Sequence, residues 1–279
     1  MIQNAKLKIQ NGIDYHCHIL PGLDDGAADM TAAVDIARVL ADAGFSEVCC
    51  TPHLIRGSYE AGHNLFRKSL TILQRKLDDK GINLRLLQGQ EYHLDEFLMG
   101  FLQDPRPIAG TEFLLVEIPD HAKAEIVKET LYQIRCSGYI PVIAHPERRG
   151  LFDATEKQKS GRLTFLGSIF SNSKLKTQNS KLNSPFLMDY LKDLGCLFQG
   201  NIGSFAGIYG ESVRKRAIGY LQQGLYTCIG SDAHSARKLA GWLDMGLREV
   251  ARHVGDEGLQ ALLLGLPLET KGKAVGVRQ

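Results

Sequence analysis

Short apolar runs alternate with longer amphipathic segments along most of the chain. The short runs have no helical period and are predicted to form buried strands, over residues 13–18, 47–51, 84–89, 113–118, 140–144, 196–201 and 226–230. The longer segments carry apolar residues at helical spacing, and several end near a glycine. They are predicted to form helices over residues 32–43, 65–77, 126–134, 186–194, 212–222, 242–254 and 259–264. Such alternation is typical of parallel strands joined by crossover helices.

The number of predicted strands is one short of a closed (β/α)8 barrel, so we expect an α/β fold built as a distorted or incomplete barrel. The 279 residues, 44% of them hydrophobic, suffice for one large domain over residues 1–279. The pattern fails in residues 157–184, where Ser, Asn, Lys and Gln dominate. We interpret this segment as a flexible surface insertion, either a tolerated loop or a site for a partner.

Charge, apolar runs and cysteines narrow the class of protein. The net charge is +2, but residues 157–184 hold six Lys or Arg and no acidic residue, so the body of the chain is not a basic nucleic-acid platform. No apolar run suits a signal sequence or a membrane span. Six cysteines without a Cys-x-x-Cys pair indicate neither a disulfide framework nor a thiolate zinc site. A cytoplasmic protein without a nucleic-acid partner or direct membrane insertion is expected.

Potential metal ligands stand at the ends of the predicted strands. In a β/α barrel the carboxyl ends of the strands converge on one face, so ligands far apart in sequence meet in one pocket. His16 and His18 lie two residues apart on a strand, so both side chains point the same way. A carboxylate in an apolar strand is costly to bury unless it binds a cation. The candidate ligands are His16, His18, His53, Glu91, Glu117, His145, Asp232 and His234.

The loops after the strands add two further features. Asp24 and Asp25 follow the first strand, and one of them could bind metal while the other caps the next helix. Pro146 turns the chain after His145 and would present Arg148 near the metals. Imidazole and carboxylate ligands suit manganese, iron or zinc, and adjacent ions would activate a shared water. A multinuclear metal hydrolase is therefore predicted, and on a phosphate ester Arg148 would be suited to clamp the phosphoryl oxygens bidentately.

Four segments give the chain a specific family resemblance. They are HCHILPGLDDG at residues 16–26, TPH at 51–53, AHPER at 144–148 and SDAH at 231–234. In order and spacing they resemble the bacterial tyrosine-protein phosphatases of the polymerase-and-histidinol-phosphatase (PHP) superfamily, which act in capsule and exopolysaccharide synthesis. The resemblance implies a distorted (β/α)7 barrel, three metal ions that are usually manganese, and hydrolysis of phosphotyrosine on the tail of a tyrosine autokinase.

The same resemblance implies a role for each residue. The first ion would be held by His16, His18, Glu91 and Asp232. The second would share Glu91 and also be held by Glu117 and His145. The third would be held by His53, His234 and one of Asp24 or Asp25. Arg148 would bind the phosphate. Relatives tend to carry another arginine about five positions beyond the last histidine, where this chain has Leu239, so Arg237 becomes the substitute candidate. Homo-oligomers are common among such relatives.

Other functions compete with this prediction. Cys50 and Arg56 have the Cys-x5-Arg spacing of thiol-dependent tyrosine phosphatases, but Pro52 removes one backbone N–H from the loop that would cradle phosphate. The same barrel and metals could serve histidinol phosphate or another phosphomonoester. A non-catalytic regulatory barrel is the third alternative. The Asp24-Asp25-Gly26 turn favours the tyrosine phosphatase branch.

Overall fold

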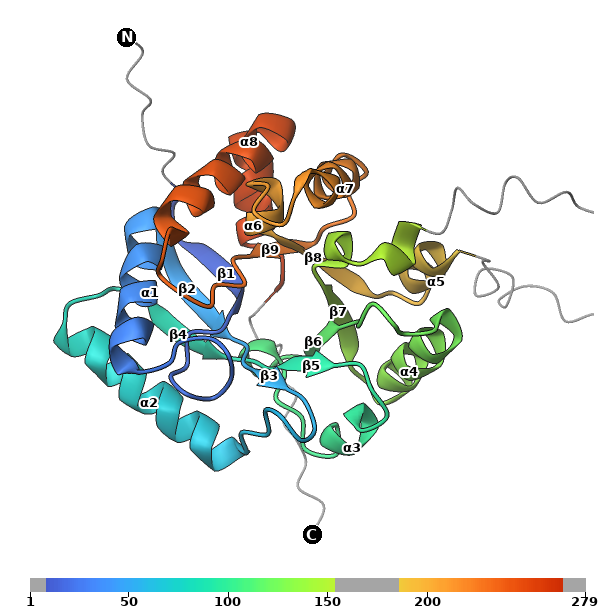
Figure 1. Ribbon diagram of the computed structural model, residues 1–279, viewed down its shortest axis with the longest axis horizontal. Coiled ribbons are helices and arrows are strands. Elements are labelled where there is room, and N and C mark those ends of the chain that lie inside the picture. Colours follow the sequence, from blue (N-terminus) through green and yellow to red (C-terminus); the bar gives the residue numbers. More distant parts are fainter. Residues whose placement is uncertain (1–8, 154–185, 268–279) are drawn as a thin grey trace, which may run out of the picture.

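The computed structural model describes residues 9–153 and 186–267, and the insertion predicted at 157–184 falls outside the described residues. Parallel strands form a curled sheet with helices on its outer side (Figure 1). The strands are β1 (Gly12–Cys17), β2 (Phe45–Cys50), β3 (His53–Leu54), β4 (Arg85–Gln88), β5 (Glu91–His93), β6 (Phe113–Glu117), β7 (Ile140–Ala144), β8 (Leu197–Asn201) and β9 (Cys228–Gly230). Each predicted strand overlaps an observed one, and the predicted parallel α/β arrangement is confirmed.

The helices also follow the predicted segments closely. They are α1 (Met30–Ala43), α2 (His63–Asp79), α3 (Leu98–Phe101), α4 (Ala124–Cys136), α5 (Leu187–Asp193), α6 (Ile202–Phe205), α7 (Glu211–Gln222) and α8 (Leu239–Leu263). The four-residue helices α3 and α6 were not predicted. The two helices predicted at 242–254 and 259–264 form the two parts of α8, which breaks at Gly255 with φ 75°. Among the described residues, no helix combines the length and apolarity that a membrane crossing needs.

Hydrogen bonds link the strands into a sheet that curls back on itself. The pairing order is β1-β2-β4 in one part and β3-β5-β6-β7-β8-β9 in the other. Residues 51–52 separate β2 from β3, and Pro52 has no N–H to continue the ladder there. Beyond this break, the N–H of Glu91 donates to the carbonyl of Pro52 at 3.1 Å, where the pairing of β3 with β5 begins. The N–H of His18 donates to the carbonyl of Ala233 at 3.1 Å and brings the ends of β1 and β9 together.

Residues in the strands alternate between two buried clusters because successive side chains point to opposite faces of a sheet. In β6, Leu115 belongs to a cluster whose described members come from strands and connecting segments. Leu114 and Val116 belong to the larger cluster, which packs the helices against the sheet. Glu117 has the same parity as Leu115, so its carboxylate points inward at the carboxyl end of the strand.

The start of α1 shows which aspartate caps this helix. The side chain of Asp29 accepts a hydrogen bond from the N–H of Ala32 at 2.9 Å and caps the helix. The expectation that Asp24 or Asp25 caps this helix is therefore wrong, because the loop continues for four residues beyond Asp25 before the helix begins. The helix ends at Gly44, whose φ of 102° suits a residue without a side chain.

Candidate functional site

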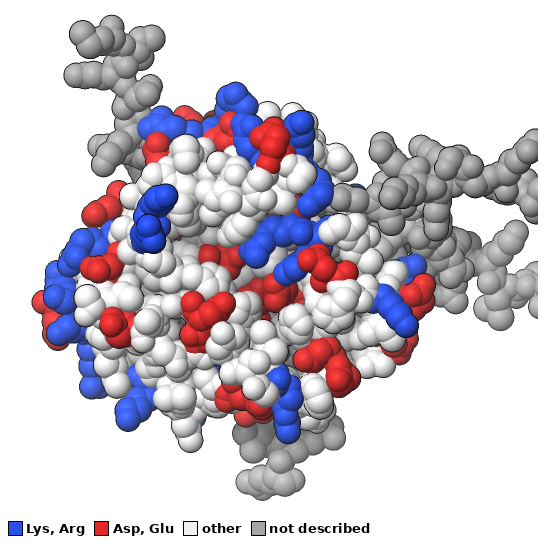
Figure 2. All heavy atoms as spheres, in the orientation of Figure 1, with Lys and Arg blue, Asp and Glu red and all other residues white. Residues whose placement is uncertain are grey.

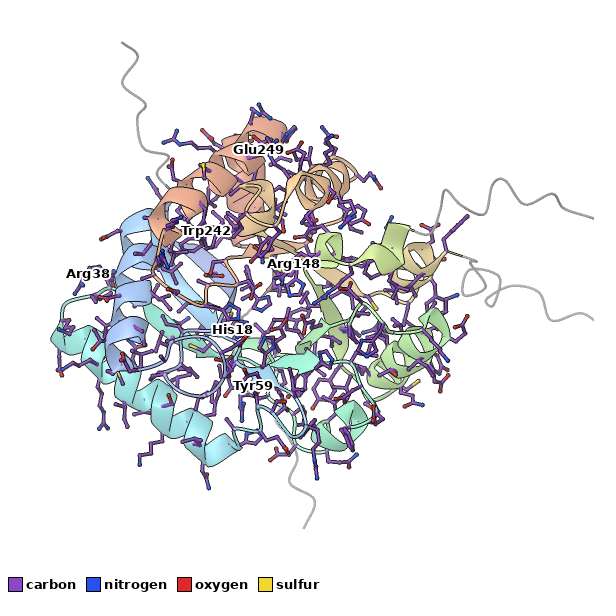
Figure 3. The ribbon with its side chains drawn as sticks, viewed as in Figure 1. His18, Arg38, Tyr59, Arg148, Trp242 and Glu249 are labelled. Carbon is purple, nitrogen blue, oxygen red and sulfur yellow. The ribbon has the colours of Figure 1, made fainter. Side chains whose placement is uncertain are left out.

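The carboxyl ends of the strands bring together histidines and carboxylates from across the chain. Their side-chain nitrogen and oxygen atoms form three overlapping groups, each within 4.8 Å. The groups are His16, His18, Glu91 and Asp232; His18, Asp25, His53 and His234; and His53, Glu91 and Glu117. Because His18, His53 and Glu91 each belong to two groups, the groups form one continuous cluster, called the ligand cluster below. His18 lies near the middle of the molecule, whereas Arg38 and Glu249 lie at its outside (Figure 3).

Glu91 lies at the centre of the ligand cluster. Its Oε2 atom is 3.2 Å from Nε2 of His16, 3.2 Å from Nε2 of His18 and 2.9 Å from Nδ1 of His53. Glu91 Oε2 and His53 Nδ1 are nevertheless buried without a properly oriented hydrogen bond. Orphaned buried polar atoms are costly, and convergent imidazole nitrogens and carboxylate oxygens are the donors that divalent metals take. The residues present therefore fit a metal centre.

Asp232 contacts the same two histidine rings as Glu91. Its Oδ1 atom lies 3.4 Å from Nε2 of His16 and 3.2 Å from Nε2 of His18. The side chain of Gln199, in the middle of β8, holds Nδ1 of His16 at 3.0 Å, so the ring presents Nε2 to the carboxylates. A partner on the far nitrogen of a histidine sets the tautomer and orientation of the ring.

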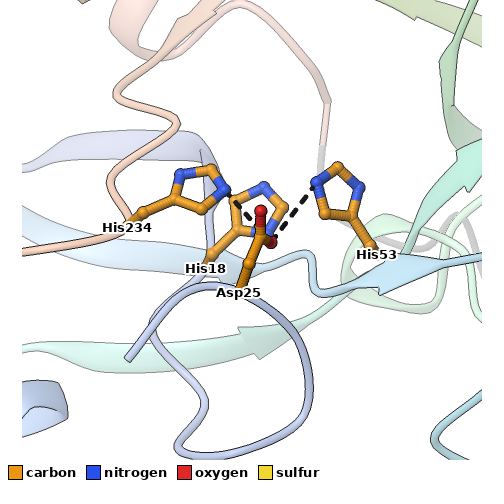
Figure 4. Close-up of side chains that lie close together, drawn as sticks. All are labelled: His18, Asp25, His53 and His234. Carbon is orange, nitrogen blue, oxygen red and sulfur yellow. Dashed lines mark ion pairs between the residues drawn. The ribbon is translucent and has the colours of Figure 1, made fainter. Parts of the chain in front are cut away.

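Asp25 and Asp24 occupy different places. Asp25 Oδ1 lies 3.7 Å from Nε2 of His53 and 3.5 Å from Nε2 of His234 (Figure 4). Asp24 instead accepts hydrogen bonds from Nδ1 of His18 at 2.6 Å and from the N–H of His53 at 2.9 Å. The geometry therefore puts Asp25 among the imidazoles, and Asp24 behind His18.

Glu117 and His145 lie near Glu91 in the remaining part of the ligand cluster. Nε2 of His145 lies 3.2 Å from Glu91 Oε1 and 4.0 Å from Glu117 Oε1. Nδ1 of His145 is buried without a hydrogen-bond partner. Glu117 also contacts the guanidinium of Arg149 and Nδ1 of His93, the latter at 3.2 Å. The structure therefore places His93 and Arg149, which are not among the predicted ligands, beside the expected ligands.

The backbone is strained at two of these residues. His145 has φ 32° and Asp232 has φ 54°, a left-handed conformation that residues other than glycine seldom adopt. Both follow the last residues of strands, β7 and β9. Gly230 leaves no room for a side chain, because a Cβ there would lie 2.6 Å from Cβ of His16. Strain of this kind persists where surrounding contacts enforce it, often at functional sites.

Burial and neighbouring charges shift the pKa values of His16 and Asp232 in opposite directions. Burial alone would lower the pKa of His16, but Glu91 and Asp232 more than offset it and raise that pKa to about 9. Burial alone would raise the pKa of Asp232, but the charge of His16 and a hydrogen bond with His18 hold it well below its usual range. Without metal, these contacts favour a charged His16 beside an ionised Asp232.

Arg148 lies at the edge of the ligand cluster, on the short 3-10 turn Pro146–Arg148 (Figure 3). Its Nη1 atom donates to Oδ2 of Asp232 at 2.5 Å, and its guanidinium lies over the ring of Tyr209, 4.4 Å from the centroid. Asn201 donates to the same Asp232 oxygen at 2.9 Å. Figure 2 shows acidic side chains in the middle of this face directly beside basic ones. Arg237 is exposed, and its backbone N–H donates to Oγ of Ser235 at 3.2 Å. Among the residues that the structure describes, its guanidinium forms no ion pair with a carboxylate of the ligand cluster.

Sequence reasoning overlooked the residues that support the cluster from behind. Asn201 ends a predicted strand, so the rule that pointed to the histidines could have found it, whereas Gln199 lies inside that strand. Tyr209 carried no such signal, because it lies in the loop between α6 and α7.

Comparison with known proteins places the chain in a family. The sequence profile described as "Capsular polysaccharide synthesis, CpsB/CapC" matches residues 12–169 and 180–269. The chain belongs to the CpsB/CapC family. Among CpsB/CapC relatives, the tyrosine-protein phosphatase YwqE of Bacillus subtilis strain 168 is 28% identical over 227 residues, which cover 81% of this chain and 78% of YwqE. The tyrosine-protein phosphatase CpsB of Streptococcus agalactiae serotype V is 23% identical over 254 residues, 90% of this chain and 95% of CpsB.

A crystal structure from the same family supports the match. It comes from work on YwqE of Bacillus subtilis and CpsB of Streptococcus pneumoniae, which are described as metal-dependent tyrosine phosphatases. The TM-score is 0.73 with 27% sequence identity, over 92% of this chain and 95% of the other.

The thiol alternative has no support in this CpsB/CapC chain. Cys50 is fully buried in β2, and burial raises the pKa of its thiol far above neutrality. The side chain of Arg56 is 57% exposed and pairs with Glu60. Cys50 is therefore a packed strand residue rather than a nucleophile facing a phosphate loop.

Proposed function

We propose that the protein is a metal-dependent protein-tyrosine phosphatase. The observation that carries this proposal is the ligand cluster, which consists of three overlapping groups of imidazoles and carboxylates. Each of His18, His53 and Glu91 belongs to two of these groups. The cluster lies in a chain of the CpsB/CapC family, whose named relatives include tyrosine-protein phosphatases.

The proposed ligand sets start from the three groups, with His145 added beside Glu91 and Glu117 and with His18 assigned to the first ion alone. One ion would be held by His16, His18, Glu91 and Asp232. A second would be held by Glu91, Glu117 and His145, with His53 in reach. A third would be held by His53, His234 and Asp25. We propose three divalent ions, with manganese as the native metal; iron and zinc accept the same donors. Asp24 is proposed to orient His18 and not to bind metal, since it already accepts from Nδ1 of that ring.

The proposed chemistry is attack of activated water on a phosphate monoester. Divalent ions in such a site lower the pKa of a shared water and neutralise the phosphoryl oxygens. Arg148 would bind the non-bridging oxygens with the guanidinium nitrogens that Asp232 does not use. A phenol leaves as an anion with an ordinary pKa near 10, which makes a strong general acid less necessary than for an alkyl ester.

The proposed substrate is a phosphotyrosine protein, a tyrosine autokinase of capsule or exopolysaccharide synthesis. The family description supports the process, and the relatives' names support the reaction. A cytoplasmic location is proposed with it, since the described cysteines are free thiols. We also propose that the curled sheet is a distorted (β/α)7 barrel, in which β2 with β3 and β4 with β5 are each one interrupted strand.

One experiment tests the proposal against its alternatives. Purified protein would be analysed for bound metal and assayed on a phosphotyrosine peptide, a phosphoserine peptide and histidinol phosphate. We expect bound divalent metal and a clear preference for the phosphotyrosine peptide. Preference for histidinol phosphate would establish the small-substrate alternative. Metal-loaded protein that hydrolyses none of the three would instead support a regulatory barrel.

A further inference from the structure

Tyr209 lies against the residue proposed to bind phosphate. Its ring centroid is 4.4 Å from the guanidinium carbon of Arg148. Its hydroxyl lies 3.5 Å from Nδ2 of Asn201, which donates more closely to Asp232. Tyr209 thus touches both groups that bond to Oδ2 of Asp232, although it belongs to no ligand group itself.

The loop between α6 and α7 holds Tyr209 in this place. Gly207 and Gly210 flank it with φ of 78° and 96°, a conformation that favours glycine. The N–H of Ile208 donates to the carbonyl of Gly203 at 3.2 Å, and the N–H of Gly210 donates to that of Gly207 at 3.1 Å. Tyr209 is half-buried, and the backbone that carries it is a short hydrogen-bonded turn.

One hydrogen bond alone would leave the plane of Arg148 undetermined. Nη1 is tied to Asp232 at 2.5 Å, but the guanidinium could still rotate about that contact. An aromatic ring against its face removes this freedom, because the planar cation stacks on the negative face of the ring. Within residues 9–153 and 186–267, Nε and Nη2 have no hydrogen-bond partner, so these two donors are available to an anion at the ligand cluster.

We propose that Tyr209 is a positioning residue, which fixes the plane of the Arg148 guanidinium so that its unused edge meets the phosphoryl group bidentately. This inference rests on the proposed function. Only the flat face of Tyr209 is required, so phenylalanine should replace it and an aliphatic side chain should not.

A double-mutant cycle tests the proposal. The variants are Tyr209→Phe, Tyr209→Leu, Arg148→Ala and the combination of Tyr209→Leu with Arg148→Ala. The readouts are kcat/KM on a phosphotyrosine peptide, the affinity of the metal-loaded protein for inorganic phosphate, and metal content. Tyr132→Leu, which removes an exposed tyrosine on α4, serves as the matched control.

We expect Tyr209→Leu to weaken both phosphate binding and kcat/KM by about threefold to thirtyfold, the range of a cation–π contact, with metal content unchanged. Tyr209→Phe and Tyr132→Leu should stay close to wild type. In the Arg148→Ala background, Tyr209→Leu should cause no further loss, because there is no guanidinium left to position.

An equal loss from Tyr209→Leu with and without Arg148 would overturn the proposal, as would a Tyr209→Phe variant as impaired as Tyr209→Leu. Failure of the proposed function would look different. A wild-type protein that hydrolyses no phosphotyrosine would refute the activity, whereas the phosphate-binding cycle would still report whether Tyr209 acts through Arg148.

Discussion

The carboxylate of Asp24 accepts a hydrogen bond from Nδ1 of His18 at 2.6 Å. That contact turns Nε2 of His18 toward Glu91 and Asp232, at 3.2 Å from an oxygen of each. The adjacent carboxylate, Asp25, lies instead between His53 and His234 (Figure 4). Two neighbouring residues of the same type therefore have different expected effects on the metal centre.

Substitutions of Asp24 and Asp25 should separate these roles. Asp25→Ala should lower the metal bound per protein, because one group loses its carboxylate. Asp24→Asn should keep all ions at saturating metal but weaken their affinity by about tenfold to a hundredfold, since it disturbs the orientation of His18. Elemental analysis and metal titration measure both effects. Equal losses of bound metal in the two variants would contradict the assignment.

Joint replacement of His16 and His18 by alanine should abolish both metal binding and turnover. The two rings face the same oxygen of Glu91 at 3.2 Å each, so one group loses two ligands together. Elemental analysis and the phosphotyrosine assay provide the measurement, and circular dichroism confirms that the variant is folded. If the folded double variant kept its full metal content, the assignment of the cluster would be wrong.

Arg148→Ala should leave the metals bound and slow hydrolysis. The lost interaction strengthens as charge develops on the phosphoryl group, so we expect a loss of about tenfold to a thousandfold in kcat/KM, by analogy with removal of a preorganised donor. Arg237→Ala is the matched control, and its effect should be smaller because that side chain is exposed and, among the described residues, lacks the contact with Asp232 that Arg148 makes. Wild-type turnover in Arg148→Ala would show that the arginine is structural only.

A chelator should abolish the phosphatase activity, whereas Cys50→Ser should not. Chelation should inactivate the enzyme and added manganese should restore it. Cys50→Ser should keep most of the activity, because burial holds the thiol pKa too high for a thiolate near neutral pH. Both preparations would be assayed on one phosphotyrosine peptide. A metal-loaded but inactive serine variant, together with a chelator-resistant wild type, would replace the metal mechanism with a thiol mechanism.

Metal affinity should rise with pH. In the metal-free cluster Glu91 and Asp232 overcome the effect of burial and raise the pKa of His16 to about 9, so this ring carries a proton at pH 7. A metal binds the neutral ring, so binding at pH 7 must release protons, and the apparent affinity should fall as the pH is lowered from 9. Calorimetry in buffers of different ionisation enthalpy measures the protons released. Affinity that is independent of pH, without proton release, would contradict this prediction.

The local pattern of the chain was sufficient to predict the architecture and most of the cluster. Apolar runs such as residues 140–144 form strands within a few residues of the predicted bounds, because a strand buried on both faces of the sheet needs a short continuous run of apolar residues. The spacing of His16 and His18 predicted that both side chains point the same way, because side chains two apart in an extended segment share one face. The convergence of strand ends in a β/α fold then predicted that this pair lies together with the ligands at the other strand ends.

Tertiary structure alone decided which neighbour each side chain meets. The difference between Asp24 and Asp25 depends on how one loop folds over β1, since both are carboxylates in the same turn. The contact of Arg148 with Asp232 joins residues 84 positions apart. The stacking of Tyr209 depends on a glycine-flanked turn between two helices. Such contacts are set by the distances between elements and by side-chain rotamers, which a periodic pattern of apolar residues does not encode.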